Sequence, residues 1–271
     1  MSANTRHVID LNAPLGIYRD LDSHWITIIS SGHLSGLLDD EDIHDIVTEA
    51  LDYGVSIGAS VEYPKDYKNS VEHNRGKKSE TARTTELAAL RDVFLKQITK
   101  IANVCLGEGS NIAYIKAEGA LYDDAARDSR LGETLLDAIF ELEENLVYGD
   151  ASNGSFEGDI PILGLPHSVL PELAKACGRT FYSEAYVSRN YAGDGLLLPL
   201  WSQGSASRGL DEASARLLSL LREGVLRLKN GSTLFLQPES IALSSIARED
   251  LRVAQGLQSL LLEAGFQIKG L

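Results

Sequence analysis

Short apolar runs rich in β-branched residues alternate with longer segments of helical period along nearly the whole chain. Short runs bounded by turn residues are typical of buried strands, and apolar residues at every third or fourth position are typical of amphipathic helices. The pattern therefore predicts an α/β fold built from repeated strand–helix units. Strands are expected at residues 8–11, 25–30, 55–59, 112–116, 160–164, 181–185 and 240–243.

The predicted helices fall between most of these strands. The first one, residues 39–53, carries acids in its first turn, ends before Gly54 and places its apolar residues on one face. Asn230-Gly231 separates two apolar runs, 225–228 and 233–236, which predicts a hairpin with a type I′ turn. Later helices are expected at residues 84–106, 131–146, 168–177, 211–223 and 248–264.

Seven strands with crossover helices can close into a barrel or remain an open, doubly wound sheet. The closed barrel is favoured because about 250 residues is the typical size of a βα barrel. An open nucleotide-binding sheet would often show a Gly-rich fingerprint after the first strand, and this sequence has none there. No linker or shift of composition divides the chain, so a single domain over residues 1–271 is expected.

The charge balance narrows the classes of partner. The chain has 25 Lys and Arg residues against 39 Asp and Glu residues, a formal charge of −14, which argues against binding to nucleic acid or to anionic membranes. No apolar segment is long enough for a signal peptide or a membrane span, so a cytoplasmic protein is expected. One stretch, from Lys65 to Arg91, has seven basic residues against four acids; it is either a docking loop for an anionic substrate or acidic partner, or a solvated loop.

Candidate chemistry lies where the predicted strands end, because the carboxyl ends of parallel strands converge on one face of a βα barrel. Lys116 and Arg189 are suited to bind a carboxylate or phosphoryl group, and a carboxylate of raised pKa can move protons. The alternative is that Lys116 and Glu118 only make ion pairs at the barrel rim. The residues at these strand ends are Asp10, Asn12, Lys116, Glu118, Glu184 and Arg189.

Other motifs that carry chemistry are missing from the sequence. The six histidines, at positions 7, 24, 33, 44, 73 and 167, have no metal-ligand spacing, so no metal site is expected. The segment 75–79 lacks the upstream glycine and the preceding strand of a P-loop, so any ATP must be held in another way.

Several segments at the strand ends resemble, in order and spacing, the LamB/YcsF family, which includes the A subunit of the bacterial ATP-dependent 5-oxoprolinase. The resemblance extends from about residue 8 to the C-terminus, and its most specific part is the block Gly119-Ala120-Leu121-Tyr122 after a strand that ends in Lys116. The other matching segments are Asp10-Leu11-Asn12-Ala13, residues 54–59 with Tyr63-Pro64, Ser183-Glu184 followed by Arg189, Tyr191 and Asp194-Gly195, and Ser240-Ile241.

The resemblance implies a seven-stranded βα barrel of the glycoside hydrolase/deacetylase type. It also implies a protein that works with partner subunits of the oxoprolinase B and C type to open 5-oxoproline or a related lactam to an amino acid, at the expense of ATP. The resemblance implies Asp10, Asn12, Lys116 and Glu184 as catalytic residues, and Glu118 is added to them from its place at a strand end. The residues implied to bind substrate or phosphate are Lys116, Tyr122 and Arg189.

The chain departs from the family pattern at positions that carry acid, base or ligand character. None of the four histidines expected at the barrel mouth remains, although Asp10, Asn12, Lys116, Glu184 and Arg189 do. The substituted positions are Pro14, Ile17, the segment 36–40, Ser60, Glu118, Ser188, Leu200 and the segment 244–246.

Two hypotheses of different class follow from these departures. The first is a working subunit with an altered site, in which Asp10 or Glu118 is the base and Lys116 and Arg189 clamp an anion. The second is a catalytically inactive paralogue with a binding or regulatory role in such a complex. One further possibility, a metal-dependent deacetylase, follows only from the fold, and the missing metal ligands argue against it.

Overall fold

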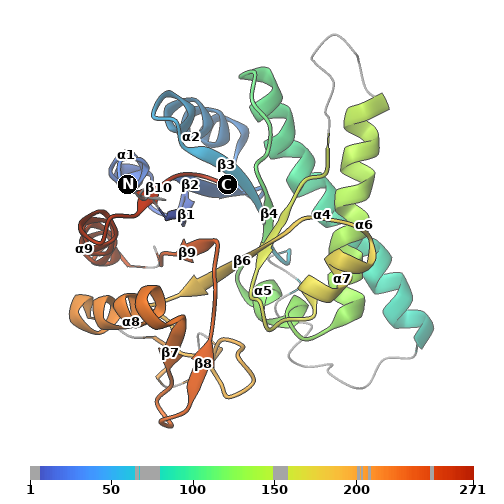
Figure 1. The fold of residues 1–271 in the computed structure, drawn as a ribbon. Helices are drawn as coiled ribbons and strands as arrows, with labels where there is room; N and C mark the ends of the chain where they lie inside the picture. The colour runs from blue at the N-terminus through green and yellow to red at the C-terminus, as the bar shows by residue number, and fades with distance from the viewer. Residues whose placement is uncertain are drawn as a thin grey trace, which may run out of the picture.

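The computed structural model describes residues 7–64, 67, 80–148, 158–199, 202, 204–206, 209–244 and 247–271. Within these residues, seven parallel strands close into a barrel in the order β1-β2-β3-β4-β5-β6-β9, and β9 pairs back with β1 (Figure 1). The predicted seven-stranded α/β barrel is therefore confirmed. Its strands are β1 (Val8–Leu15), β2 (Ser31–Ser35), β3 (Ser56–Val61), β4 (Ile115–Ala117), β5 (Ile162–Gly164), β6 (Phe181–Tyr186) and β9 (Ser240–Ala242).

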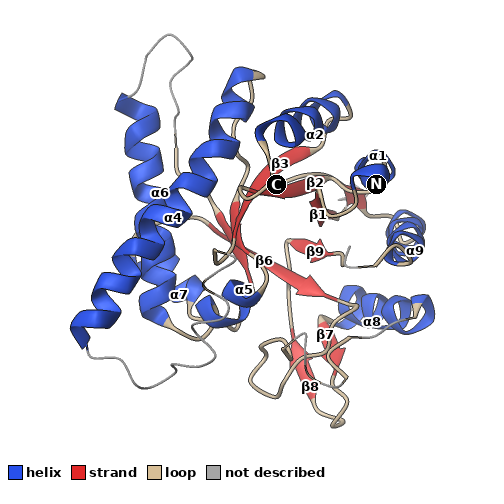
Figure 2. Ribbon diagram, turned by 180° about the vertical axis from the view of Figure 1, so that it is seen from behind, coloured by secondary structure: helices blue, strands red, loops and turns tan. Residues whose placement is uncertain are grey.

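Helices surround the barrel (Figure 2). The short strand β10 (Gln267–Ile268) pairs with the start of β1. The six predicted helices are present as α2 (Asp40–Asp52), α4 (Glu80–Gly107), α6 (Ser129–Tyr148), α7 (Leu170–Ala176), α8 (Leu210–Glu223) and α9 (Asp250–Glu263). The pattern did not predict η1 (Arg19–Leu21), α1 (Asp22–Ile26) or α5 (Ala120–Ala125). In α2, the Asp39 side chain caps the first turn by accepting the Asp42 backbone N–H at 2.8 Å.

The prediction of a strand at residues 25–30 is wrong. Trp25 lies in α1, and its carbonyl accepts the backbone N–H groups of Ile28 at 2.8 Å and Ile29 at 3.1 Å, as in a helical turn. These apolar side chains are buried because the turn packs against the barrel. The true strand, Ser31–Ser35, is more polar than the run before it because alternate residues face a polar barrel interior.

The predicted hairpin is present as β7 (Val225–Arg227) and β8 (Thr233–Phe235), but the predicted type I′ turn is wrong. A type I′ turn requires positive φ at two successive residues, and here Gly231 has φ +83° while Asn230 does not have a positive φ. The Gly231 N–H donates to the Leu228 carbonyl at 2.9 Å. The loop is therefore a type I turn followed by a left-handed glycine.

Strand alternation separates an apolar layer from a polar interior. Ile57, Ala59 and Ile115 point outward into the core between sheet and helices. Inward-facing side chains from β1, β2, β4, β6 and β9 form hydrogen bonds across the barrel instead: Asp10, Asn12, Ser31, His33, Lys116, Glu184, Tyr186 and Ser240.

Two other expectations from the sequence concern the basic segment 65–91 and the lack of a membrane span. Of the basic residues between Lys65 and Arg91, only Arg91 has a described side chain, so the proposed docking loop lies outside the described residues. None of the described helices combines the length and the apolar character that a membrane crossing requires.

Gly58 on β3 allows the fully buried ring of Tyr114 to lie inside the barrel. A Cβ atom at this position would overlap the ring carbons Cε2 and Cζ of Tyr114. We expect Gly58→Ala to lower the free energy of unfolding by about 1–3 kcal/mol, since overpacking a dense interior forces neighbouring atoms to move. Urea denaturation monitored by circular dichroism measures the change.

Gly107→Ala is the matched control for this substitution, because a Cβ atom at Gly107 has no heavy atom within 4 Å. We expect it to leave the free energy of unfolding unchanged or to raise it by up to about 1 kcal/mol. Equal effects of the two substitutions would contradict the close contact between Gly58 and Tyr114.

Candidate active site at the barrel mouth

A buried ion pair lies at the centre of the barrel interior. Lys116 on β4 places its Nζ 2.6 Å from Oε2 of Glu184 on β6, and both side chains have no exposed surface. Nζ also donates to the Tyr186 hydroxyl at 3.0 Å and to Oδ1 of Asn12 at 3.3 Å. The three protons of the ammonium group therefore each have an acceptor, as a buried cation requires.

The carboxylate of Glu184 is equally well satisfied. Its Oε1 accepts the Tyr122 hydroxyl at 2.7 Å, and its Oε2 accepts the Asn12 amide at 3.2 Å. Burial, together with the nearby charge of Glu184, raises the pKa of Tyr122 and of Tyr186 well above the usual range, so both hydroxyl groups remain protonated. Both rings also lie near the ammonium group, with centroids 5.5 Å and 5.2 Å from Nζ.

Asp10 on β1 lies in a nest of serine hydroxyls. Its Oδ1 accepts from Ser30 at 2.7 Å, and its Oδ2 accepts from Ser31 at 2.9 Å and from Ser240. The Asn12 amide donates to Ser240 Oγ at 2.7 Å, so the serine links Asp10 to the central network. Burial raises the pKa of Asp10, although the three hydroxyl donors act in the opposite direction.

Glu118 and His33 form a second polar pair nearer to solvent. His33 on β2 is 1% exposed, and its Nε2 lies 3.1 Å from Oε2 of Glu118, whose side chain is 31% exposed. Burial lowers the pKa of His33, and the positive charge of Lys116 lowers it further. Burial alone would raise the pKa of Glu118, but the hydrogen bond from His33 and the charge of Lys116 bring it down to about 2. The pair is thus a carboxylate beside a neutral imidazole.

Arg189 lies beyond the end of β6, at the edge of the network. Its guanidinium group donates to the Leu198 carbonyl at 2.9 Å and lies 3.9 Å from Oδ1 of Asp123. It also lies 5.5 Å from the ring centroid of Tyr186, the same ring that the Lys116 ammonium approaches. Its buried Nε has no hydrogen-bond partner. Arg189 therefore retains donor capacity, whereas Lys116 does not.

The structure brings most of the predicted site residues together. Asn12, Lys116, Tyr122 and Glu184 share direct hydrogen bonds, and Asp10 joins them through Ser240. The alternative prediction was that Lys116 and Glu118 make ion pairs at the barrel rim. Both residues are paired, Glu118 with His33 and Lys116 with Glu184, but the pair of Lys116 lies inside the barrel and not at its rim.

Sequence reasoning missed five residues of this site. His33 stands at a strand end in the sequence, but its contact with Glu118 joins positions 85 residues apart, which one sequence alone does not reveal. The other four are a tyrosine and three serines whose hydroxyl groups matter only because of what they face: Tyr186, Ser30, Ser31 and Ser240.

The expected lack of a metal site and the effect of the substituted family positions stay predictions. Within the described ranges, no three His, Cys, Asp or Glu side chains are arranged to bind a metal ion. Of the positions substituted relative to the family pattern, Leu200, Ser245 and Ile246 lie outside the described residues.

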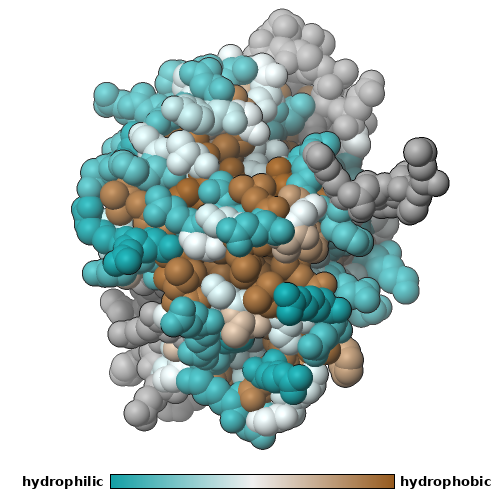
Figure 3. All heavy atoms as spheres, turned by 60° about the vertical axis from the view of Figure 1, so that its left-hand side comes forward, coloured by the Kyte–Doolittle hydropathy of each residue, from teal (hydrophilic) through white to brown (hydrophobic). Residues whose placement is uncertain are grey.

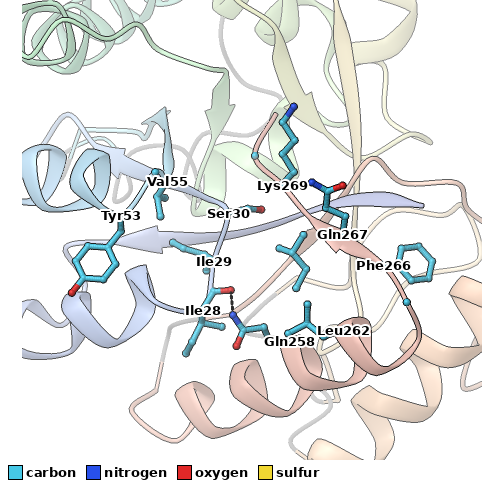
Figure 4. A pocket seen from close by; sticks show the side chains of 14 residues that line it. Ile28, Ile29, Ser30, Tyr53, Val55, Gln258, Leu262, Phe266, Gln267 and Lys269 are labelled. Atoms are coloured by element: carbon cyan, nitrogen blue, oxygen red, sulfur yellow. Dashed lines mark hydrogen bonds between the residues drawn. The ribbon is translucent and has the colours of Figure 1, made fainter. Parts of the chain in front are cut away.

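A cavity of about 630 Å³ lies between α9, β10 and the turn before β2 (Figure 4). Ile28, Leu262 and Phe266 line it, and Gln258 donates to the Ile28 carbonyl at 2.8 Å. Apolar side chains reach the surface on the side of the molecule that carries α8 and α9 (Figure 3). None of the predicted site residues lines this cavity, but Ser30, which donates to Asp10, does.

The Lys116–Glu184 pair predicts a strong coupling between the two residues. We expect Lys116→Met and Glu184→Gln each to lower the free energy of unfolding by about 3–5 kcal/mol, because each leaves a buried charge uncompensated. The double variant should lose less than the sum of the single losses. Urea denaturation of the four proteins measures the coupling, and additive losses would show that the pair is not coupled.

Comparisons with known proteins agree with this architecture. The 5-oxoprolinase A subunit of Neisseria meningitidis serogroup C is 27% identical over 263 residues, which cover 96% of this chain and 98% of that protein. The 5-oxoprolinase A subunit of Bordetella pertussis is 28% identical over 178 residues, which cover 66% of this chain and 65% of that protein.

Two solved structures share the fold, and a family match covers nearly the whole chain. The lactam utilization protein of Thermus thermophilus superposes with a TM-score of 0.77 at 23% identity, covering 97% of this chain and 99% of that chain. A structure of pneumococcal StrH gives a TM-score of 0.52 at 10% identity, covering 97% and 86%. The sequence model of the LamB/YcsF family matches residues 9–271. The resemblance at the strand ends is thus confirmed, and this chain belongs to the LamB/YcsF family.

Proposed function

We propose that this chain is a divergent A-type subunit of a 5-oxoprolinase-like enzyme, which opens 5-oxoproline or a related lactam to an amino acid. The observation that carries the proposal is the network of Asn12, Lys116, Tyr122 and Glu184 inside the barrel, between strands whose carboxyl ends carry the chemistry in such folds. Relatives named as 5-oxoprolinase A subunits, together with a neighbour named lactam utilization protein, support it. ATP, partner subunits of the B and C type, and a cytoplasmic location belong to the same proposal.

The chemistry of a lactam matches the charges at the mouth. An amide carbonyl is a poor electrophile, and ATP supplies a phosphoryl group that activates its oxygen. Arg189 fits a phosphoryl or carboxylate group, because its Nε is buried without a partner and a guanidinium binds such anions through paired donors. Tyr122 and Lys116 hold the Glu184 carboxylate in place, so we assign this network the task of positioning the substrate rather than binding the anion.

The alternative is a catalytically inactive paralogue with a binding or regulatory role. It is favoured by the closure of the central network, since Lys116 and Glu184 have no exposed surface and their polar atoms are bonded to each other and to neighbours. The missing family histidines point the same way. The two candidates differ in one measurable property, which is turnover.

The decisive experiment is an assay of glutamate release from 5-oxoproline plus ATP. The purified chain is assayed alone and together with candidate B-type and C-type subunits, and bound metal is measured in the same preparations. Sustained turnover that depends on this chain would support the enzyme. No turnover in any combination, with 5-oxoproline still raising the melting temperature, would instead favour the binding role.

Tyr122→Phe tests the role of the network without removing a charge. The substitution keeps the ring but removes the hydroxyl that donates to Glu184, so we expect kcat to fall about 10-fold to 100-fold, the range set by a hydrogen bond to a charged group. Tyr53→Phe is the matched control, because Tyr53 is 62% exposed and far from the network. Unchanged turnover in Tyr122→Phe would remove the network from the mechanism.

A further inference from the structure

We propose that His33 is the proton acceptor of this site and that Glu118 is the carboxylate that orients it. The inference rests on the proposed function and replaces the sequence expectation that Asp10 or Glu118 is the base. Its starting point is a pair of facts about one ring: Nε2 of His33 lies 3.1 Å from Glu118, and Nδ1 is buried without a hydrogen-bond partner.

The geometry determines which nitrogen carries the proton. A carboxylate only accepts hydrogen bonds, so the Nε2 of His33 must donate to Oε2 of Glu118. In a neutral imidazole the other nitrogen then carries a lone pair, which leaves Nδ1 as an acceptor. A buried acceptor without a partner is rare in proteins and calls for a reason, and a proton or ligand atom received during the reaction is such a reason.

The charges around His33 keep it neutral but able to take up a proton. Four groups face or influence the ring: Glu118 beside Nε2, Lys116 on β4, Glu184 on β6, and the ring of Tyr114, whose centroid lies 6.4 Å away. Burial and the charge of Lys116 lower the pKa of His33, while Glu118 and Glu184 raise it. The imidazole is therefore unprotonated near neutral pH, and Glu118 stabilises the imidazolium that forms on proton transfer.

The two carboxylates expected to act as the base fit that role less well. The oxygens of Asp10 already accept the hydroxyl groups of Ser30, Ser31 and Ser240. Glu118 has a pKa of about 2, so it is a weak acceptor of protons near neutral pH. Neither limit applies to Nδ1 of His33, which has a free lone pair.

The arrangement also accounts for one substitution relative to the family pattern. Glu118 stands at one of the positions where this chain departs from the family pattern, and the resemblance implies a histidine there. Across the mouth, β2 supplies His33 to face it. A histidine is therefore present at the mouth, but it comes from a different strand and is oriented by the residue that stands at the original histidine position.

The proton transfer is balanced over the ring opening. Water loses a proton to Nδ1 of His33 as its oxygen bonds to the carbonyl carbon of the O-phosphorylated lactam. The C–N bond then breaks, and the ring nitrogen takes the proton from Nδ1, which returns the imidazole to its neutral form. The carboxyl phosphate that remains is hydrolysed by a second water to the carboxylate and inorganic phosphate. The phosphoryl donor is the ATP of the proposed function.

Two variants separate proton transfer from mere positioning. His33→Gln places an amide donor where Nε2 lies, so it preserves the hydrogen bond to Glu118 but has no basic nitrogen. We expect it to lower kcat by at least about 100-fold, the usual contribution of a general base, with KM little changed. His44→Gln is the control, because His44 is 59% exposed and remote from the site. A kcat of His33→Gln close to that of the wild type would overturn the proposal.

Glu118→Gln tests the orienting carboxylate through the pH profile. Loss of the negative charge removes a contribution that raises the pKa of His33, so that pKa should fall. Proton uptake by His33 then begins at lower pH, and the acidic limb of kcat/KM should shift to lower pH. A shift to higher pH, or no shift, would contradict the assignment.

Nitrogen-15 NMR of the histidine-labelled full chain tests the proposal independently of turnover. We expect His33 near neutral pH to be neutral and protonated at Nε2, with a titration midpoint below the usual value of about 6.5. A proton on Nδ1, or a charged ring at neutral pH, would overturn the proposal.

If the wild type has no turnover in any combination, the proposed function fails. In that case 5-oxoproline is added to the labelled chain to test the role of His33 separately. A changed Nδ1 signal supports a ligand contact at His33, and an unchanged signal overturns the proposal for His33.

Discussion

One positive and one negative charge, on Lys116 and Glu184, lie side by side inside the barrel with no exposed surface. Removing such charges from water costs several kcal/mol per ion unless their remaining donors and acceptors are satisfied. The surrounding structure meets this requirement with the amide of Asn12 and the hydroxyls of Tyr122 and Tyr186. Side chains from β1, β4, β6 and α5 therefore converge on one point, and closure of the barrel and assembly of the site depend on the same contacts.

Burial, hydrogen bonds and the charge of Lys116 together decide how the neighbouring groups titrate. Burial and then Lys116 lower the pKa of His33, which keeps the ring neutral, whereas the hydrogen bond from His33 and then Lys116 lower the pKa of Glu118 against the effect of burial, which keeps it ionised. Asp10 lies among three serine hydroxyls and shows the opposite shift, because burial raises its pKa. Carboxyl groups of similar intrinsic acidity thus differ in character within one barrel, and burial, hydrogen bonds and distance from Lys116 account for the difference.

The misplacement of the second strand has its origin in the polar interior of the barrel. Ser31–Ser35 was missed as a strand because its inward residues hydrogen-bond to Asp10 and Glu118, whereas the apolar run before it is a buried helical turn. The helix at Asp40–Asp52 was predicted well because its apolar residues face one packed surface and Asp39 caps its start. Hydrophobic periodicity reports burial against an apolar layer, and it fails where the buried partners are polar.

Local pattern and motif order in the amino-acid sequence were sufficient to identify the fold class, the order of the helices, the family and the residues at the strand ends. The pairing of those residues followed only from the folded barrel: Lys116 meets Glu184 rather than Glu118, and Glu118 meets His33. The physical reason is that residues of distant strands become neighbours only through barrel closure. Whether a buried charge or lone pair has a partner is likewise a property of that closed arrangement.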